Sequence, residues 1–323
     1  MSLRICAALA AALTLVVGDG IAQGFKPTRP VEIVVHTGPG GGSDVFARTM
    51  IQIIESEKLV PVRMHVLNKP GAGGAAALAY TIEKKGEPHT VAAYTSIWMT
   101  LALTSAESKV KFADLTPIAN LIFDPELAVV KSDSPYKTLG DFIEAAKKNP
   151  KQMRQAGGSV EGRANLVRHL LQKTTGATWQ YIPFPGGGER IAALLGGHVQ
   201  LLIIGPEEIK EQLKGGTMRA VAQIADKRLE GHPNVPTMQE LYKIPNVRAL
   251  RGVAMPPGVS KEAAEYWEGV FARMVKTKGW RKYLADSEAE DGYIRAAEIP
   301  KLNEDFVAQR REMYHEAGIK TAR

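Results

Sequence analysis

The chain has a single cysteine, Cys6, among its 323 residues. A disulfide scaffold is therefore excluded, and so are zinc and iron–sulfur sites that need several cysteines. The seven histidines never fall in the His-x-x-x-His or His-Glu-x-x-His spacing that places two metal ligands on one helix face. No apolar run reaches the roughly 20 residues of a membrane-spanning helix. We therefore expect neither a metal nor a cofactor.

The first residues have the pattern of a secretory signal. Arg4 precedes an apolar run over residues 5–17, and Gly20 and Ala22 place small residues at the positions that a signal peptidase inspects. A membrane anchor is the alternative, but the run is short for one. The pattern predicts a signal peptide over residues 1–22 and a periplasmic protein. Since Cys6 lies inside the removed segment, the exported chain would carry no thiol into an oxidising compartment.

Short apolar runs alternate with amphipathic stretches along the rest of the chain. Strand-like runs at residues 31–35, 90–94 and 201–204 are followed by stretches with helical spacing. This alternation predicts α/β domains, each a mostly parallel sheet flanked by helices. Segments 109–125 and 244–257, rich in proline and polar residues, are candidate crossings between domains. They divide the chain into a discontinuous domain 1 (residues 27–124 and 248–323) and an inserted domain 2 (residues 125–247), with a ligand cleft between them.

A glycine-rich loop at residues 37–44 follows the first predicted strand and precedes a helix. Glycines let bare backbone N–H groups approach a ligand, and Ser43 or Asp44 can cap the helix. Together with the helix dipole, these features predict an anion site. A plain strand–helix turn is the alternative, but three consecutive glycines exceed what such a turn needs. The loop is no phosphate-binding Walker loop, because the Lys-Ser/Thr pair is missing.

Two further loops share this composition. Residues 71–76 formally fit a dinucleotide-binding pattern, but no acidic residue ends the next predicted strand to hold a ribose. Nucleotide binding is therefore disfavoured. Residues 183–188 repeat the Pro-Gly-Gly-Gly run in the second domain. Two such loops predict two jaws, each offering backbone donors to one end of an acidic ligand.

Signatures of catalysis and of nucleic-acid binding fail. Around Ser159 the nucleophile-elbow pattern has Glu161 where glycine is required. The net charge of +7 allows an acidic partner, but no basic cluster is interleaved with aromatic residues, so no nucleic-acid partner is expected. A secreted hydrolase or a nucleotide-dependent oxidoreductase is thus a weak alternative. Trp98 and Trp179 are predicted to pack in the core.

The order of these motifs resembles the extracytoplasmic solute receptors of tripartite tricarboxylate transporters, the Bug-type or TctC-type family. The resemblance rests on Pro-Gly-Gly-Gly-Ser-Asp at residues 39–44, Asn-Lys-Pro-Gly-Ala-Gly-Gly at 68–74, Pro-Phe-Pro-Gly-Gly at 183–187 and Met-Pro-Pro-Gly at 255–258. The chain departs from the family pattern at His89, Asn165 and Gln200.

The resemblance implies a two-domain, flytrap-like periplasmic binding fold that captures small carboxylates, aromatic acids or amino acids. It implies that the first and third glycine loops hold carboxylates through backbone N–H groups and bridging waters. The partners would be one small and one large membrane permease subunit, and we expect a monomer. A sensor for a membrane signalling partner would use the same fold. The expected ligand-binding residues are Pro39, Gly40, Gly41, Gly42, Ser43, Asp44, Ala72, Gly73, Thr95, Ser96, Ser159, Phe184, Pro185, Gly186, Gly187 and Gly205.

Overall fold

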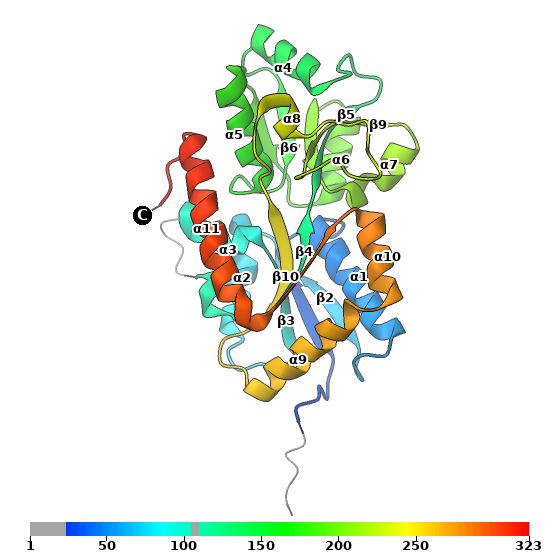
Figure 1. Ribbon diagram of the computed structural model, residues 1–323, viewed down its shortest axis with the longest axis vertical. Helices are drawn as coiled ribbons and strands as arrows, with labels where there is room; N and C mark the ends of the chain where they lie inside the picture. The colour runs from blue at the N-terminus through cyan, green and yellow to red at the C-terminus, as the bar shows by residue number, and fades with distance from the viewer. Residues whose placement is uncertain (1–23, 105–109, 323) are drawn as a thin grey trace, which may run out of the picture.

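The most apolar runs of the sequence form the centres of two β-sheets. The computed structural model describes residues 24–104 and 110–322, so the predicted signal peptide lies outside the described residues. β1 (Val31–Val35), β3 (Thr90–Thr95) and β8 (Leu201–Ile204) are almost entirely buried. Continuous rather than alternating hydrophobicity is typical of strands that are covered on both faces. Each sheet accordingly has helices on both sides, which gives two lobes (Figure 1).

The first lobe contains a six-stranded sheet in the order β11-β4-β10-β3-β1-β2. Its other strands are β2 (Met64–Asn68), β4 (Thr116–Asp124), β10 (Ala249–Met255) and β11 (Glu290–Arg295). One face is covered by α1 (Gly42–Ser56), α9 (Lys261–Met274) and α10 (Lys278–Ser287). The other face is covered by α2 (Ala75–Glu83), α3 (Ser96–Thr104) and α11 (Ile299–Glu316). Short 3-10 turns complete the lobe: η1 (Ala72–Gly74), η2 (Phe112–Asp114) and η4 (Ala296–Glu298).

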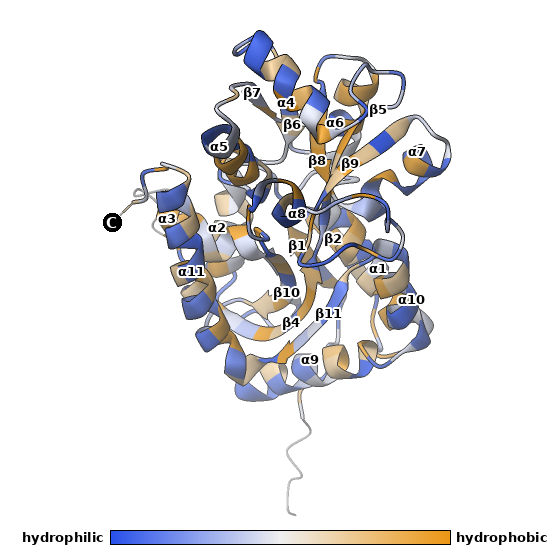
Figure 2. Cartoon of the chain, turned by 45° about the horizontal axis from the view of Figure 1, so that its top comes forward, coloured by the Kyte–Doolittle hydropathy of each residue, from blue (hydrophilic) through white to orange (hydrophobic). Residues whose placement is uncertain are grey.

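The second lobe contains a five-stranded sheet in the order β7-β6-β8-β5-β9. Its other strands are β5 (Glu126–Lys131), β6 (Arg154–Gly157), β7 (Gln180–Pro183) and β9 (Met218–Ile224). Its helices are α4 (Leu139–Lys148), α5 (Arg163–Thr175), α6 (Gly187–Leu195), α7 (Lys210–Lys214) and α8 (Met238–Tyr242), with the turn η3 (Pro206–Ile209). Figure 2 shows hydrophobic strands such as β8 and β9 inside this lobe, and helices such as α4 that are partly hydrophilic.

The chain passes between the lobes at the ends of long strands. β4 belongs to the first sheet, and β5, one residue later, belongs to the second; β10 returns the chain to the first sheet. The segments predicted as crossings between domains at residues 109–125 and 244–257 contain β4 and β10, which pair with each other.

The predicted two-lobed α/β fold is confirmed, and the sheets are mixed rather than mostly parallel. β1 is parallel to β2 and β3, and β6 is parallel to β7 and β8. The pairs made by β4, β5 and β10 are antiparallel. The reason is the chain path: β4 leaves the first lobe and β10 re-enters it beside β4, so the two run in opposite directions.

Trp98 and Trp179 are buried, as predicted, at 1% and 2% exposure. The end of α11 reaches the second lobe. Met313, Tyr314 and Ala317 pack in the core of the second lobe. Across the described ranges, no helix combines the length and hydropathy needed to cross a membrane.

Candidate functional site

A cavity of about 400 Å³ lies between the lobes. It is lined by the loops that follow the carboxyl ends of parallel strands in both sheets, the usual place for a ligand in open α/β sheets. Its walls in the first lobe are His36, Thr37, Gly42, Ser43, Pro70, Gly71, Gly73, Gly74, Thr95, Ser96, Ile97, Ala249, Leu250 and Arg251. Its walls at the crossing and in the second lobe are Asp124, Glu126, Gly158, Ser159, Gly162, Arg163, Ala164, Pro183, Phe184, Pro185, Arg190 and Glu208.

Three helices begin at this cavity, and their first residues line it: α1 at Gly42, α3 at Ser96 and α5 at Arg163. The first N–H groups of a helix have no partner inside the helix and carry its positive dipole end. In the described chain, no protein acceptor takes the backbone N–H of Gly42 or Ser43. The cavity therefore offers free donors at the start of α1 and the positive ends of helix dipoles from both lobes.

The first glycine loop forms a fixed turn rather than a side-chain cap. α1 begins at Gly42, inside the predicted loop of residues 37–44, and Gly41 is its N-cap without a side-chain hydrogen bond. Ser43 and Asp44 thus lie within the first turn, so the prediction that one of them caps the helix is wrong. Gly40 has a φ of 75°, a left-handed conformation that favours glycine.

The carboxylate of Asp44 holds this loop in place instead of lining the cavity. It accepts hydrogen bonds from the backbone N–H of Gly40 at 2.9 Å, from Arg48 Nε at 2.9 Å and from Asn68 Nδ2 at 3.0 Å. Although burial opposes ionisation, these bonds lower the pKa of Asp44 below its ordinary value. Asp44 and Asn68 therefore link the first and second glycine loops.

The first and third glycine loops meet across the mouth of the cavity. The N–H of Gly38 donates to the carbonyl of Pro185 at 3.2 Å, a hydrogen bond between the two lobes. A Cβ on Gly187 would lie 2.5 Å from the carbonyl oxygen of Gly40, closer than real Cβ atoms approach. The two loops are thus in direct contact, which is a closed arrangement of the lobes.

The sixteen expected binding residues divide into two groups. Half line the cavity: Gly42, Ser43, Gly73, Thr95, Ser96, Ser159, Phe184 and Pro185. The other half do not line it: Pro39, Gly40, Gly41, Asp44, Ala72, Gly186, Gly187 and Gly205. Several of these lie directly behind it; Gly205, for example, donates its N–H to Glu208 at 3.4 Å.

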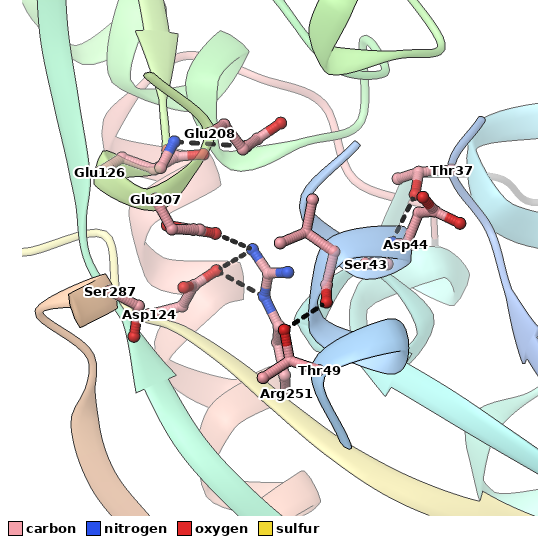
Figure 3. Close-up of polar contacts among 12 residues, drawn as sticks. Thr37, Ser43, Asp44, Thr49, Asp124, Glu126, Glu207, Glu208, Arg251 and Ser287 are labelled. Atoms are coloured by element: carbon pink, nitrogen blue, oxygen red, sulfur yellow. Dashed lines mark hydrogen bonds and ion pairs between the residues drawn. The ribbon is translucent and has the colours of Figure 1, made fainter. Parts of the chain in front are cut away.

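Sequence reasoning missed a cluster of buried charges beside the cavity. Arg251 on β10 contacts Asp124 Oδ2 through Nε at 2.7 Å and through Nη2 at 2.5 Å. The same Nη2 lies 3.6 Å from Glu207, which comes from the second lobe (Figure 3). Two further pairs, Arg190–Glu208 at 2.7 Å and Arg163–Glu126 at 2.8 Å, complete the cluster. Isolated arginines and glutamates in the sequence gave no spacing signal, since five chain segments supply them.

Burial shifts the titration of this cluster. It lowers the pKa of His36 to about 4, and the positive charges of Arg251 and Arg190 add to the effect. Burial, with the neighbouring Asp124 carboxylate, raises the pKa of Glu207 to about 8. Near neutral pH, His36 is therefore neutral. Although burial opposes its charge, Asp124 and Glu207 raise the pKa of Arg251 above its ordinary value, so it stays a cation.

None of the three departures from the family pattern lines the cavity. The side chain of Gln200 accepts the N–H of Arg154, and Asn165 donates to the carbonyl of Val160. His89 accepts the N–H of Thr28 beside Glu87. All three make structural hydrogen bonds. Within residues 24–104 and 110–322, no group of three His, Cys, Asp or Glu side chains is placed to hold a metal ion.

A larger groove of about 820 Å³ also spans the lobes, but it has a different character. It is lined mainly by residues 225–232 and 284–290 and by none of the expected binding residues. Many of its charged groups pair with each other between the lobes, as in Lys210–Asp286 at 3.0 Å and His232–Glu288 at 3.2 Å. The smaller cavity, with its free amides, is the stronger candidate for a ligand site.

Two α/β lobes joined by crossing strands, with a cavity between them, define a bilobed binding protein of the periplasmic type. Solved structures have the same fold. The periplasmic binding protein BugD is 22% identical with a TM-score of 0.84, and the alignment covers 91% of this chain and 99% of that chain. An R. palustris protein solved with adipate is also 22% identical, with a TM-score of 0.85 over the same shares. MatC from Rhodopseudomonas palustris, solved with malate, is 21% identical with a TM-score of 0.80, over 89% of this chain and 99% of that chain.

The chain belongs to the tripartite tricarboxylate transporter receptor family, TctC, whose pattern it matches over residues 50–319. It is 26% identical to the UPF0065 protein in the gbd 5' region of Cupriavidus necator over 98% of this chain and 96% of that protein. It is 29% identical to BugT of Bordetella pertussis over 67% of this chain and 66% of that protein. The family is one of receptors, which favours a binding protein over an enzyme.

Proposed function

We propose that the chain is a periplasmic solute receptor that captures a small carboxylate in the cavity between its lobes and delivers it to the membrane subunits of a tripartite transporter. The observation that carries this proposal is the convergence of three helix N-termini, from both lobes, on one cavity. Such ends bind anions through free N–H groups and the helix dipole. Membership of the receptor family, and the adipate and malate in structures of the same fold, support a carboxylate as the ligand.

Capture would proceed by closure of the lobes. The first lobe supplies Gly42 and Ser43 at the start of α1, and the second supplies Ser159 near the start of α5. The hydroxyl oxygen of Ser159 is buried and has no protein partner in the described chain. A ligand that touches both sets stabilises the closed state, because only that state brings them together. The membrane partners, one small and one large permease subunit, would then bind the closed receptor. The receptor would act as an exported monomer.

A thermal-shift panel tests the proposal. Dicarboxylates of three to six carbons, including malate and adipate, together with tricarboxylates, aromatic acids and amino acids, are added to the purified protein at millimolar concentration. A binder present at 100 times its Kd stabilises the folded state by about 2.7 kcal/mol, which is readily seen as a higher Tm. The matched diamides serve as controls for charge. If no acid raises the Tm, the protein is not a carboxylate receptor.

A further inference from the structure

We propose that Arg251 is a ligand-contacting side chain, which binds an anionic group of the ligand through Nη1 at the first turn of α1. This inference rests on the proposed function and deepens it. Backbone donors respond to any acceptor, whereas a buried guanidinium adds a full positive charge and a preference for carboxylates. The receptor would therefore select for the ligand's charge with a side chain as well as with backbone N–H groups.

Among the described residues, the guanidinium nitrogens of Arg251 do not all have hydrogen-bond partners. Nε and Nη2 of Arg251 both contact Asp124, and Nη2 also faces Glu207. Nη1 is buried and has no hydrogen-bond partner in the described chain. Figure 3 shows this third nitrogen directed toward the start of α1, away from the two carboxylates. Because a buried charged donor without an acceptor is costly, an acceptor from outside the protein is the natural partner.

The guanidinium of Arg251 also lies close to the start of α1. A Cβ on Gly42 would lie 2.6 Å from Nη2 and 3.0 Å from Nη1, so the guanidinium occupies the space that any other side chain would need. Gly42 and Ser43 are the residues whose backbone N–H groups are free, and both line the cavity together with Arg251. An anion at this point would meet two backbone donors, the dipole of α1 and a guanidinium at once.

The buried arginines around the cavity pair with buried carboxylates. Three arginines, at 163, 190 and 251, each have one close carboxylate, from Glu126, Glu208 and Asp124 in turn. Glu207 lies farther off, 3.6 Å from Nη2 of Arg251, and does not contact Nη1. Arg190 and Arg163 bond through the nitrogens that face the cluster, and neither has a nitrogen among the buried atoms that lack a partner. Arg251 is therefore the arginine of this cluster with a fully buried nitrogen that lacks a hydrogen-bond partner in the part of the chain that the structure describes.

Removing Arg251 alone would leave Asp124 as a buried unpaired carboxylate, which is destabilising. The test therefore uses the double variant Asp124→Asn/Arg251→Gln beside Arg251→Gln. Calorimetric titration measures the affinity for the acid of the panel that binds most tightly and for its monoamide. The control is Arg248→Gln, since Arg248 lies near the same strand, pairs with Glu290 at 3.0 Å and does not line the cavity.

We expect the double variant to fold and to lose at least about tenfold in affinity for the acid, which corresponds to about 1.4 kcal/mol. Its preference for the acid over the monoamide should shrink, and Arg248→Gln should bind like the wild type. If the folded double variant keeps both the affinity and the preference, Arg251 is not the anchor, although the receptor function stands. If no acid binds the wild type, both proposals are overturned.

Discussion

At the scale of single residues, His36 is a neutral side chain close to the buried charges of Arg251 and Arg190. It follows β1 and lines the cavity, and its Nδ1 lies 3.4 Å from Ser43 Oγ. Burial and the nearby Arg251 and Arg190 lower its pKa to about 4. In the unfolded chain, the pKa returns to its ordinary value near 6.5. At pH values between the folded and unfolded pKa of His36, the unfolded state binds a proton that the folded state does not bind. The free energy of unfolding therefore falls as the pH falls.

We expect the variant His36→Gln to lose this part of the pH dependence. Between pH 7 and pH 5, the free energy of unfolding of the wild type should fall by up to about 2 kcal/mol more than that of the variant. Urea unfolding at several pH values measures the difference. His65→Gln is the control, because His65 is exposed on β2. Parallel pH profiles for wild type and His36→Gln would contradict the burial of a neutral imidazole.

The glycine run shows how far a sequence predicts single residues. The left-handed turn at Gly40 and the helix start near Gly42 are local properties, and the sequence predicted both a turn and an anion site there. The reason for Gly42 is not local. Its missing side chain makes room for Arg251, some 200 residues further along the chain, and that pairing arises only once the strands are ordered in the sheet.

At the scale of elements, the two Pro-Gly-Gly-Gly loops form one contact between the lobes. The sequence predicts two separate jaws, each with backbone donors for one end of the ligand. In the structure, Gly38 donates to Pro185, and Gly187 faces the carbonyl of Gly40 at a distance that only glycine allows. Gly186 and Gly187 therefore do not line the cavity. A glycine at 187 lets the second lobe approach the first without displacing backbone.

Substituting Gly187→Ala should oppose closure and spare the fold. The added methyl would lie 2.5 Å from a backbone oxygen of the other lobe, a clash that exists only when the lobes are closed. Its other close neighbour is Glu208 Oε2 of the same lobe, at 2.5 Å, which Arg190 holds and which would have to shift by a small amount, whereas alanine suits the first turn of α6. We expect ligand affinity to fall about tenfold or more, with a change in unfolding free energy below about 1 kcal/mol.

Gly188→Ala is the matched control for this test. It is the next residue of α6, and a Cβ there would meet no heavy atom within 4 Å. It should bind the ligand like the wild type in the same titration. Equal affinity of Gly187→Ala and the wild type would show that the closed state does not need the two loops in contact.

Strands made almost entirely of apolar residues could be predicted from the sequence, whereas two of the strands near the boundary between the lobes could not. The sequence predicted β1, β3 and β8 because central strands are buried on both faces. It did not predict β10, which carries Arg251 and Gly252 into the sheet, or β11, whose first residues are exposed acids. These strands owe their conformation to β4, which lies between them and pairs with both. Tertiary pairing of this kind leaves little trace in local composition.

At the scale of the whole molecule, α11 joins the two lobes from the side (Figure 1). Ile299 and Phe306 pack in the core of the first lobe, whereas Met313 and Tyr314 pack in the core of the second. The hydroxyl of Tyr314 also donates to the carbonyl of Glu161, in the loop before α5. The lobes are thus connected by the two strand crossings and by a helix that shares its hydrophobic face between two cores.

This sharing should make the lobes unfold together. We expect a single calorimetric transition for the wild type, because the second lobe cannot lose its core without exposing α11. Tyr314→Ala removes a side chain that is only 3% exposed, and should cost about 3–5 kcal/mol. Because that loss falls on the second lobe and on its link to the first, the transition should move to lower temperature and separate into two. Glu312→Ala, on the exposed face of the same turn, should leave the profile unchanged. Two transitions in the wild type would mean that α11 does not couple the lobes, and closure would then rest on the strand crossings and the ligand alone.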